Sequence, residues 1–458
     1  MPVSSAATLY DRDRVAVLHP HSNLKNQGSN PPIIMTGGSG VYIHDEAGNK
    51  YLDSAAGLGH CSLGFSNERL ARAAYNQMKQ LGSFHVFRNI SNAPTIELSD
   101  RLLAMAPVPM AKVLLQSGGS EANDTAVKLV WYYWSALGKP EKRKIIFREG
   151  SYHGTTCVTT ALCGNAAVNQ GFGLRFPEFL RTEPTNYWRH SNPGETEEQF
   201  SQRLADSLEA LIVREGPETV AAFIGDPTQA NSGGVLPPTG YWEKVQAVLK
   251  KYDVLLIADE VVTAFGRTGN LWGCTTFGIR PDMITCAKAL SAGMQPISAL
   301  LIGEGMYSVM KEQSDRLGAF WHGYTFAGHP VACAVAIETL NIYEEEDILG
   351  HIRQIAPFFQ QQVASLGDHP LIGNVSGLAL IGGLDLTDDK LNRSLFSKET
   401  QINVRLTSAA LKNGLFMRVL GNLRIHFSPP FIITEADIIE MVNKARKTLD
   451  DVYAGLHH

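Results

Sequence analysis

The stretch "DVLLIADE" (253–260) is an apolar run that ends in two acidic residues. Five more short apolar runs occur along the chain, with amphipathic segments between them. They are "AKVLLQ" (111–116), "KIIFRE" (144–149), "VAAFIGD" (220–226), "DMITCA" (282–287) and "ISALLIG" (297–303). Strands that are apolar throughout are buried on both faces, which is typical of a parallel sheet covered by helices. The sequence therefore predicts a large α/β domain with a mainly parallel sheet.

The regions on either side of these runs have a different pattern. Residues 37–57 alternate apolar and polar positions around "DEAGN", which predicts an antiparallel hairpin. The chain ends in a predicted helix over 434–456, with Thr434 as N-cap and Asp437 three residues on. We therefore predict an N-terminal segment of a small domain (1–69), a large domain (70–335) and a C-terminal part of the small α+β domain (336–458).

The composition is that of an ordinary globular protein. The 458 residues are 44% hydrophobic and 19% charged, with a net charge of -5. Lys and Arg form no basic stripe, and the apolar runs are only as long as strands, so we expect neither nucleic-acid binding nor a membrane span. Six cysteines without a CxxC pair and no visible secretory signal predict a reduced, cytoplasmic protein. We assign no metal site.

The ends of the apolar runs carry the functional signal. In open α/β sheets, ligands bind at the carboxyl ends of the strands. Five of the six runs end in polar or charged residues, which cost free energy to bury beside an apolar strand. These are "SGGSEAN" (117–123), "SYHG" (151–154), Asp226, the pair Asp259 and Glu260, and Lys288. Together they predict a single site at one edge of the sheet.

The segment "SGGSEAN" is a candidate phosphate site. Gly118, Gly119 and Ser120 precede a predicted helix, so free backbone N–H groups and the positive end of the helix dipole would face an anion. The alternative is a tight turn in which Ser120 only caps the helix. The segment matches neither a dinucleotide fingerprint nor a P-loop, so neither a dinucleotide nor a nucleoside triphosphate is indicated.

Two further strand ends suit a planar ring. Tyr152 offers a flat face, with His153 supporting it or contacting a ring substituent; the alternative is a core tyrosine. Asp259 could pair with a protonated ring nitrogen, and Val261, two residues on, could cover one face of the ring.

The alternative for the acidic pair Asp259–Glu260 is an ion pair with Arg267 or Arg280.

Lys288 completes this group of candidate site residues, because a lysine in apolar surroundings has a depressed pKa and its neutral amine can form a Schiff base with a carbonyl. A phosphate site, a shelf for a flat ring, an acid for its nitrogen and a Schiff-base lysine together describe pyridoxal 5'-phosphate.

From Gly37 onward the chain resembles the class III, ω-type aminotransferases, and among them the amine:pyruvate transaminases. The resemblance rests on motifs in the family's order: "SGGSEAND", "SYHG", "DP", "ADEVVTAFGRTG", "CAKAL", "HGYTFAGHP" and "RVLGNLRIHFSPPFIIT". It implies the fold type I architecture of pyridoxal-phosphate enzymes. It also implies a homodimer with shared active sites, or possibly a tetramer.

The resemblance assigns roles to individual residues. Lys288 would hold the cofactor covalently and carry the proton between substrate and cofactor. The other implied cofactor contacts are Gly119 and Ser120 at the phosphate, Tyr152, His153 and Val261 around the ring, Asp259 at the ring nitrogen, Asp226, and Thr325 at the phosphate of the neighbouring subunit's cofactor. Asp226 is shorter than the glutamate usual in the family, which puts its contact in question.

Arg418 is the implied ligand of the substrate carboxylate. Its guanidinium would bind the keto acid and swing outward when a plain amine occupies the site. Arg424 is a nearby competitor, and either arginine could instead be a surface charge. Asn231 stands where ornithine- and 4-aminobutyrate-type relatives carry a glutamate, which argues against those two specificities.

The resemblance also suggests a roomy pocket. In "AGLGHC" (56–61), Leu58 is followed by Gly59, where many relatives carry an aromatic residue. Phe87 would line the pocket opposite Tyr152, although a core position is the alternative.

The predicted reaction moves an amino group from a primary amine or ω-amino acid to pyruvate in a ping-pong scheme, with (S)-amines suggested by the resemblance. The alternatives are an aminomutase, epimerase or decarboxylase of the same fold, or a non-enzymatic α/β protein.

Overall fold

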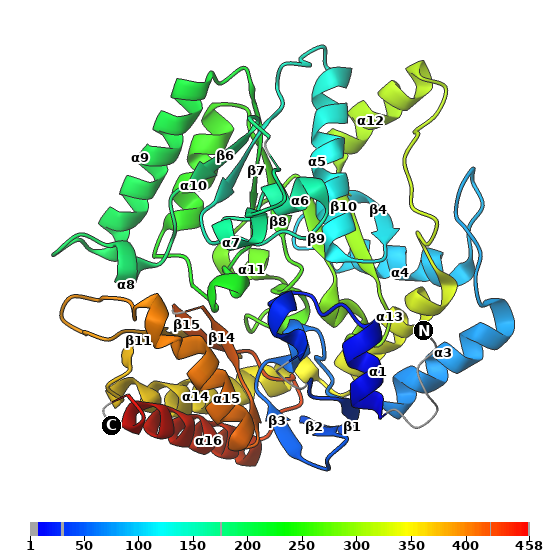
Figure 1. Cartoon of the computed structure of the whole chain (residues 1–458). Coiled ribbons are helices and arrows are strands. Elements are labelled where there is room, and N and C mark those ends of the chain that lie inside the picture. Colours follow the sequence, from blue (N-terminus) through cyan, green and yellow to red (C-terminus); the bar gives the residue numbers. More distant parts are fainter. Residues whose placement is uncertain (1–7, 29–31, 175, 422, 457–458) are drawn as a thin grey trace.

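The computed structural model describes residues 8–28, 32–174, 176–421 and 423–456. Its strands form a central sheet of seven strands and two smaller sheets of four (Figure 1). The central sheet has the order β4-β10-β9-β8-β7-β5-β6. Its strands are β4 (Met110–Gln116), β5 (Lys144–Arg148), β6 (Phe179–Thr182), β7 (Val220–Gly225), β8 (Leu255–Asp259), β9 (Met283–Cys286) and β10 (Ser298–Gly303).

The direction of the strands explains where polar residues follow them. Strands β9, β8, β7, β5 and β6 are parallel, whereas β10 is antiparallel to both of its neighbours, β9 and β4. The carboxyl ends of β4, β5, β7, β8 and β9 therefore share one edge. The reversed strand β10 is the predicted run that carries no costly residue at its end. The mainly parallel α/β sheet is confirmed, and each predicted run corresponds to a strand.

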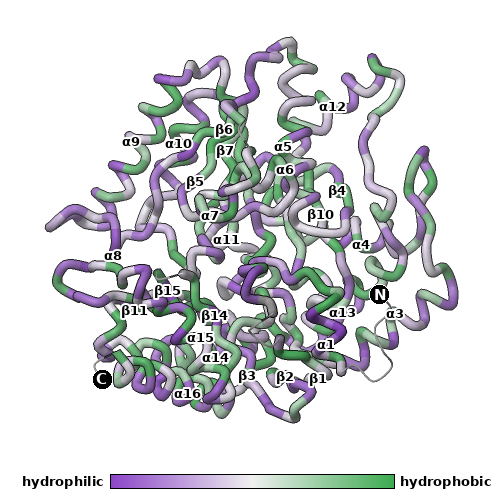
Figure 2. Tube along the Cα trace, in the orientation of Figure 1, coloured by the Kyte–Doolittle hydropathy of each residue, from purple (hydrophilic) through white to green (hydrophobic). Residues whose placement is uncertain are grey.

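Helices cover both faces of the central sheet. On one face, α5 (Gly119–Ala136) and α12 (Glu304–Arg316) pack against the strands through Val127, Val130 and Met306. On the other, α9 (Glu197–Glu215) and α10 (Tyr241–Lys251) bury Leu204 and Val245. Figure 2 shows apolar residues gathered along the central strands and polar ones on the outer loops. The strands are therefore buried on both sides, as runs without alternation predict.

The long helices begin at recognisable caps. Thr434 accepts a hydrogen bond from the Asp437 amide while the Asp437 side chain binds the Thr434 amide, which confirms the predicted cap of α16. The remaining helices are α1 (Leu9–Ala16), α2 (Ala56–Gly59), α3 (Glu68–Leu81), α4 (Ala93–Ala104), α6 (Cys157–Ala161), α7 (Ala166–Asn169), α8 (Tyr187–His190), α11 (Gly273–Phe277), α13 (Pro330–Glu345), α14 (Ile348–Ala364), α15 (Ile402–Lys412) and α16 (Glu435–Ala454). None of the described helices is both long and apolar enough to cross a bilayer.

The two smaller sheets come from the chain ends. The predicted hairpin is present as β2 (Tyr42–Asp45) and β3 (Lys50–Asp53), with β1 (Met35–Ser39) beside β2 and β13 (Leu415–Phe416) parallel to β3. The other sheet is antiparallel and consists of β11 (Ile372–Leu378), β12 (Ile381–Leu386), β15 (Arg424–Phe427) and β14 (Arg418–Leu420). The boundaries at 69/70 and 335/336 stay predictions, and residues 1–7 and 29–31 of the first segment lie outside the described residues.

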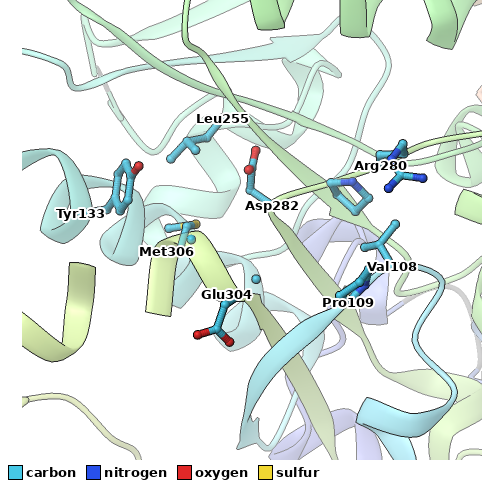
Figure 3. Close-up of a pocket in the computed structure, with 11 residues that line it drawn as sticks. Val108, Pro109, Tyr133, Leu255, Arg280, Asp282, Glu304 and Met306 are labelled. Atoms are coloured by element: carbon cyan, nitrogen blue, oxygen red, sulfur yellow. The ribbon is translucent and has the colours of Figure 1, made fainter. Parts of the chain in front are cut away.

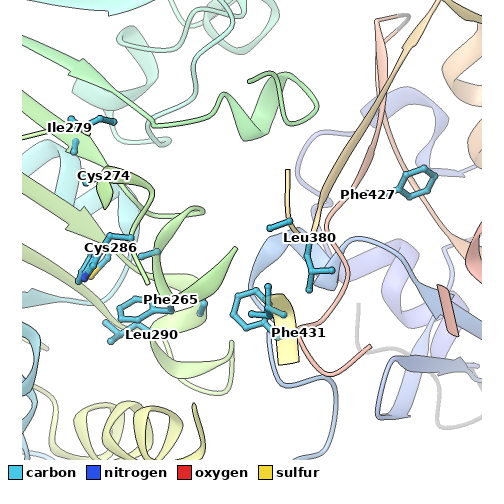
Figure 4. Packing of buried hydrophobic residues seen from close by; sticks show 14 of the residues in the cluster. Phe265, Cys274, Ile279, Cys286, Leu290, Leu380, Phe427 and Phe431 are labelled. Carbon is cyan, nitrogen blue, oxygen red and sulfur yellow. The ribbon is translucent and has the colours of Figure 1, made fainter. Parts of the chain in front are cut away.

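One apolar cluster joins the central sheet to the C-terminal part. Figure 4 shows Phe265 and Leu290 below the strand ends and Phe431 and Leu380 from the C-terminal segment, all members of the same core cluster. Burying each such side chain is worth about 1.5–3 kcal/mol. This packing fixes β14 and β15 relative to the end of β9, where the candidate site lies.

Candidate active site

Asp259, the last residue of β8, is held at this edge by three hydrogen bonds. It is 4% exposed, and its Oδ2 accepts hydrogen bonds from His153 Nδ1 at 2.7 Å and Asn123 Nδ2 at 2.8 Å. Its Oδ1 accepts from the Val261 amide at 3.0 Å. The alternative of an ion pair with an arginine is therefore wrong for Asp259 among the described residues, since its side chain contacts His153 and Asn123 instead.

The neighbouring Glu260 has a structural environment. Its side chain is fully buried and accepts hydrogen bonds from the Gly273 amide at 3.0 Å, from the Cys274 amide at 2.5 Å and from the Thr263 hydroxyl. Burial raises its pKa, and the hydrogen bonds lower it. Glu260 therefore holds the start of α11, and no ion pair with Arg267 or Arg280 joins it in the described part of the chain.

The amino end of α5 forms a cradle for an anion. Gly118, its N-cap residue, has no side chain to bind the first amides of the helix. A Cβ added to Gly119 would lie 2.9 Å from Val261 Cγ2, so only glycine lets the helix end approach this valine. Ser120 Oγ accepts a hydrogen bond from the Thr155 amide at 3.1 Å. Gly119, Ser120 and Val261 thus lie together, with the free amides available to an anion.

Lys288 lies just past the end of β9, in the turn Lys288–Ser291. Burial, followed by the positive charge of Arg418, lowers the pKa of its amine to about 8, and the charge of Asp259 opposes this shift. Its backbone φ of 48° is in the left-handed region. The Tyr343 hydroxyl holds this turn in place by donating a hydrogen bond to the Ala289 carbonyl at 2.7 Å.

This depressed pKa gives a testable pH dependence. The neutral amine attacks a carbonyl, so cofactor incorporation by the apoenzyme should quicken about tenfold per pH unit at low pH and level off near pH 8. An ordinary lysine would not level off until about pH 10.4. The rate at which visible absorbance appears after adding the aldehyde cofactor, measured across pH values, checks this. A rate that keeps rising beyond pH 9 would contradict it.

Arg418 and Asn231 meet directly. Arg418 Nη2 donates to Asn231 Oδ1 at 2.6 Å, and Tyr152 is close enough for its charge to affect the pKa of Arg418, which burial lowers. Arg424, the predicted competitor, is 2% exposed and pairs with Asp385 at 3.2 Å. Of the two arginines, only Arg418 is left without a carboxylate partner among the described residues.

Asp226 has a partner that the sequence analysis missed. Arg148, at the end of β5, donates through Nη2 to Asp226 Oδ1 at 2.7 Å and also to the Asp226 carbonyl. Burial raises the pKa of Asp226, while Arg148 and then His153 lower it. Asp226 therefore lies near the His153–Asp259 pair but is neutralised by an arginine.

The predicted rim residues are at the surface. Leu58 is 61% exposed, Phe87 is 40% exposed, and Thr325 is also exposed. The Phe87 ring lies against Gly323, where an added Cβ would be 2.9 Å away. Gly59 is buried, and an added Cβ would meet only Val262, at 3.7 Å, so the structure leaves room beside it.

Asn123 is a site residue that the sequence analysis did not single out. Its amide nitrogen donates to Asp259 and to the His153 carbonyl, each at 2.8 Å, and its oxygen accepts from Thr285 Oγ1 at 2.7 Å. It lies one turn after Gly119 on α5, so helical spacing from the glycine was the available signal.

A separate cavity of about 340 Å³ lies at the opposite edge of the sheet (Figure 3). Its lining includes Leu255 at the start of β8, Asp282 just before β9 and Glu304 just after β10. It is distinct from the site around Asp259 and Lys288.

Comparisons with known proteins agree with this geometry. Residues 24–449 match the family model of the class III aminotransferases. The chain is 45% identical over 421 residues to gamma aminobutyrate transaminase 3, chloroplastic, from Solanum lycopersicum. The aligned region covers 92% of this chain and 81% of that protein.

Two solved structures superpose closely. The omega transaminase from Pseudomonas jessenii in complex with PMP has a TM-score of 0.96 and 41% identity, covering 98% of this chain and 99% of that chain. A thermostable omega transaminase variant engineered for synthesis of enantiopure bulky amines has a TM-score of 0.95 and 42% identity, covering 98% and 100%.

The residues present fit the cofactor that this family uses. The uncapped end of α5 suits a phosphate, and the buried Asp259 suits a protonated ring nitrogen. His153 Nε2 is buried without a hydrogen-bond partner among the described residues, which is the kind of atom that a bound group satisfies. Family, fold and site thus agree: this chain belongs to the class III aminotransferases, enzymes of the pyridoxal-phosphate fold type I.

Proposed function

We propose that the enzyme transfers an amino group from a primary amine or ω-amino acid to pyruvate, giving alanine, in two half-reactions. The observation that carries this proposal is Arg418, whose only described hydrogen-bond partner is the neutral Asn231. A guanidinium that is not neutralised by a carboxylate can bind the carboxylate of a keto acid with two hydrogen bonds. The same group can be displaced when the substrate is an amine without a carboxylate.

Bound pyridoxal phosphate would supply a ring that accepts electrons from the reacting carbon. In our proposal, Gly119 and Ser120 hold the phosphate and Asp259 holds the proton on the ring nitrogen, with His153 and Asn123 fixing the carboxylate. Lys288 Nζ, whose pKa burial lowers to about 8, takes and returns the proton at the reacting carbon.

In this proposal, residues on two sides of the site enclose the cofactor ring and the substrate. Tyr152 and Val261 enclose the ring between them, and the space beside Gly59 admits the larger group of the donor. Asp226, whose charge Arg148 neutralises, lies near His153 and would stay outside the cofactor contacts.

A second candidate function has 4-aminobutyrate as donor. The curated relatives named gamma-aminobutyrate transaminases favour it. Against it stands Asn231, which contacts Arg418 where a glutamate would form an ion pair. The two functions differ only in the donor, so they are tested together.

The deciding experiment treats each half-reaction separately. The purified holoenzyme is converted to its amine form with a panel of donors that includes 4-aminobutyrate and both enantiomers of a simple aryl amine, and pyruvate is then added. We expect the aldehyde spectrum to return and alanine to form, with (S)-amines as the better donors. If pyruvate does not restore the aldehyde form, transamination to pyruvate is wrong, and products of isomerisation or decarboxylation identify the alternatives.

Replacing Arg418 with alanine is expected to raise the KM for pyruvate about 10- to 100-fold, because a charge-assisted hydrogen bond to a carboxylate contributes about 1.5–3 kcal/mol. The half-reaction with an amine lacking a carboxylate should change less than about threefold. Steady-state and single-turnover kinetics check this difference. Arg424→Ala is no suitable comparison, since it removes a buried ion pair, so Arg353→Ala at the surface serves as the control. Equal losses in both half-reactions would contradict the assignment.

We also propose a homodimer, or a tetramer built from dimers, with each site shared between two chains. The segment around Thr325 exposes Trp321 (78%) and Phe326 (60%), large apolar side chains that a partner subunit would cover. In a dimer, Thr325 would reach the phosphate of the neighbouring subunit's cofactor. A cytoplasmic location stays a prediction; the plant relatives are named mitochondrial or chloroplastic.

A further inference from the structure

His60 lies between two segments on which the candidate site depends. Residues 55–62, which include Leu58 and Gly59, are called here the pocket loop. Residues 288–293, which begin with Lys288, are called the lysine turn. The two segments are far apart in the sequence, yet the imidazole ring of His60 contacts the backbone of both.

The ring fits closely against a glycine of each segment. A Cβ added to Gly57 would lie 2.6 Å from His60 Cε1, and one added to Gly293 would lie 2.5 Å from His60 Cδ2. Both distances are far below the contact distance of about 3.5–4.0 Å between carbon atoms. The ring therefore fills the space that a side chain at either position would need, and it is packed between the pocket loop and the lysine turn.

One ring nitrogen of His60 holds the pocket loop. The Leu58 amide donates to His60 Nδ1 at 3.1 Å. Because a backbone amide can only donate, Nδ1 carries no proton, and the neutral ring has its hydrogen on Nε2. Burial and then the positive charge of Lys288 lower the pKa of His60, which favours the same neutral form. The His60 amide also donates to the Ala56 carbonyl at 2.9 Å, so the loop is closed by both the backbone and the side chain of His60.

The lysine turn is closed at the point where the ring contacts it. The Gly293 amide donates to the Lys288 carbonyl at 3.3 Å. The His60 ring, packed on Gly293, therefore supports the residue that binds the backbone of Lys288 directly. Contacts thus run without a gap from the Leu58 amide through the imidazole to the backbone of Lys288.

A second link joins the same two segments. Ser62, in the pocket loop, forms a hydrogen bond of 2.7 Å with the Tyr343 hydroxyl. The Tyr343 hydroxyl in turn donates to the Ala289 carbonyl in the lysine turn. This second link contains no ring nitrogen and does not touch Leu58, so it provides a comparison for His60.

We propose that His60 is a positioning residue that fixes the donor pocket and the reactive amine at the same time. The inference rests on the proposed function, in which the larger group of the donor lies beside Gly59 and Lys288 carries the proton. Nδ1 holds the pocket loop in the shape that leaves this space open. The ring holds the lysine turn and keeps water from it. Donor selectivity and the state of Lys288 therefore depend on different parts of one side chain.

Two substitutions separate these parts. His60→Phe keeps a flat ring without an acceptor, whereas His60→Asn keeps an acceptor in the place of Nδ1 without a ring. In His60→Phe, the ratio of kcat/KM for 1-phenylethylamine to kcat/KM for isopropylamine is expected to fall about fivefold, because a neutral hydrogen bond that holds the pocket loop is lost. In His60→Asn, this ratio should change less than about twofold. Single-turnover kinetics of the amine half-reaction measure both ratios.

The pH profile of cofactor incorporation should show the opposite order. His60→Asn lets water reach the lysine turn, which weakens the effect of burial on Lys288. The pH at which incorporation by the apoenzyme levels off should therefore rise by about one unit. His60→Phe should still level off near pH 8. A purely structural role would change selectivity and pH profile in parallel in both variants, and that result would overturn the proposal.

Hydrogen exchange of the apoprotein provides a readout that needs no reaction. Peptides of the pocket loop should exchange faster in His60→Phe, and peptides of the lysine turn should exchange faster in His60→Asn. Tyr343→Phe, which removes the second link, should loosen the lysine turn and leave the donor ratio unchanged. Tyr42→Phe, which removes a hydroxyl bound to Glu440, is the control and should change neither segment.

The outcomes distinguish this inference from the proposed function. If the wild-type enzyme fails to aminate pyruvate, the proposed function fails, whereas the exchange rates and the pH profile still confirm or refute the role of His60. Unchanged exchange of both segments in both His60 variants would overturn the inference even if the wild-type enzyme aminates pyruvate.

Discussion

Replacement of Lys288 with alanine is expected to reduce transamination by about 10⁴-fold or more and to remove the visible absorbance of the lysine–cofactor adduct. The reduction combines the loss of a covalent attachment with the loss of a proton-transferring group, and the latter alone contributes about 10²- to 10⁴-fold. Lys288→Arg keeps a cation at the position and should be equally inactive, which separates the amine's chemistry from its charge.

Lys142 provides a matched control for this experiment. It is 4% exposed, its pKa is also lowered by burial, and its Nζ donates to the carbonyls of Tyr252 and Asp253. Borohydride reduction of the holoenzyme followed by peptide mass analysis should place the cofactor on Lys288 and leave Lys142 unmodified. Cofactor mass on any other lysine, or full activity in Lys288→Ala, would refute the assignment.

Asp259→Asn is expected to lower kcat by about 10²- to 10³-fold, the range found when one preorganised electrostatic contact at a reacting group is removed. The asparagine keeps the size of the side chain but not the negative charge that would hold a proton on the ring nitrogen. It also leaves His153 Nδ1 without its charged partner. The rate of the first half-reaction, measured with saturating cofactor, reports the effect on chemistry without the effect on cofactor affinity.

Glu260→Gln is the natural comparison, because the two carboxylates are adjacent and both buried. Glu260 accepts hydrogen bonds from the amides of α11, so its substitution should lower the melting temperature and change kcat little. If Glu260→Gln slowed the first half-reaction as much as Asp259→Asn does, the charge at Asp259 would have no special role.

The fold could be predicted largely because its strands are continuous apolar runs. Each of the six runs appeared as a strand of the central sheet. The seventh strand, β6, was missed because "FLRT" is only four residues long, lies at the sheet edge and is partly exposed. The reversal of β10 was also beyond the sequence, since a buried strand has the same apolar pattern whether its neighbours are parallel or antiparallel.

The candidate site could likewise be predicted only in part. Asp259 at the end of β8 and Lys288 just past β9 could be predicted, because a charged group at the end of an apolar run is costly to bury and indicates a functional role. Their partners were not, because Asn123 lies within a helix and Arg148 within a strand, and each meets its carboxylate only through the three-dimensional packing. The buried His426 lies opposite Arg418 through the register of β14 and β15, which the sequence pattern does not give.

The reversed strand β10 differs from the other strands of the central sheet in which edge its carboxyl end reaches. It forms hydrogen-bonded ladders with β4 and β9, yet its carboxyl end points to the edge that carries the separate cavity. Its amino end lies at the edge with the reactive groups, where the Ser298 hydroxyl donates to the Gly118 carbonyl at 2.9 Å. Substitutions toward its carboxyl end can therefore change how firmly the sheet is held, whereas a substitution of Ser298 would also disturb the start of α5.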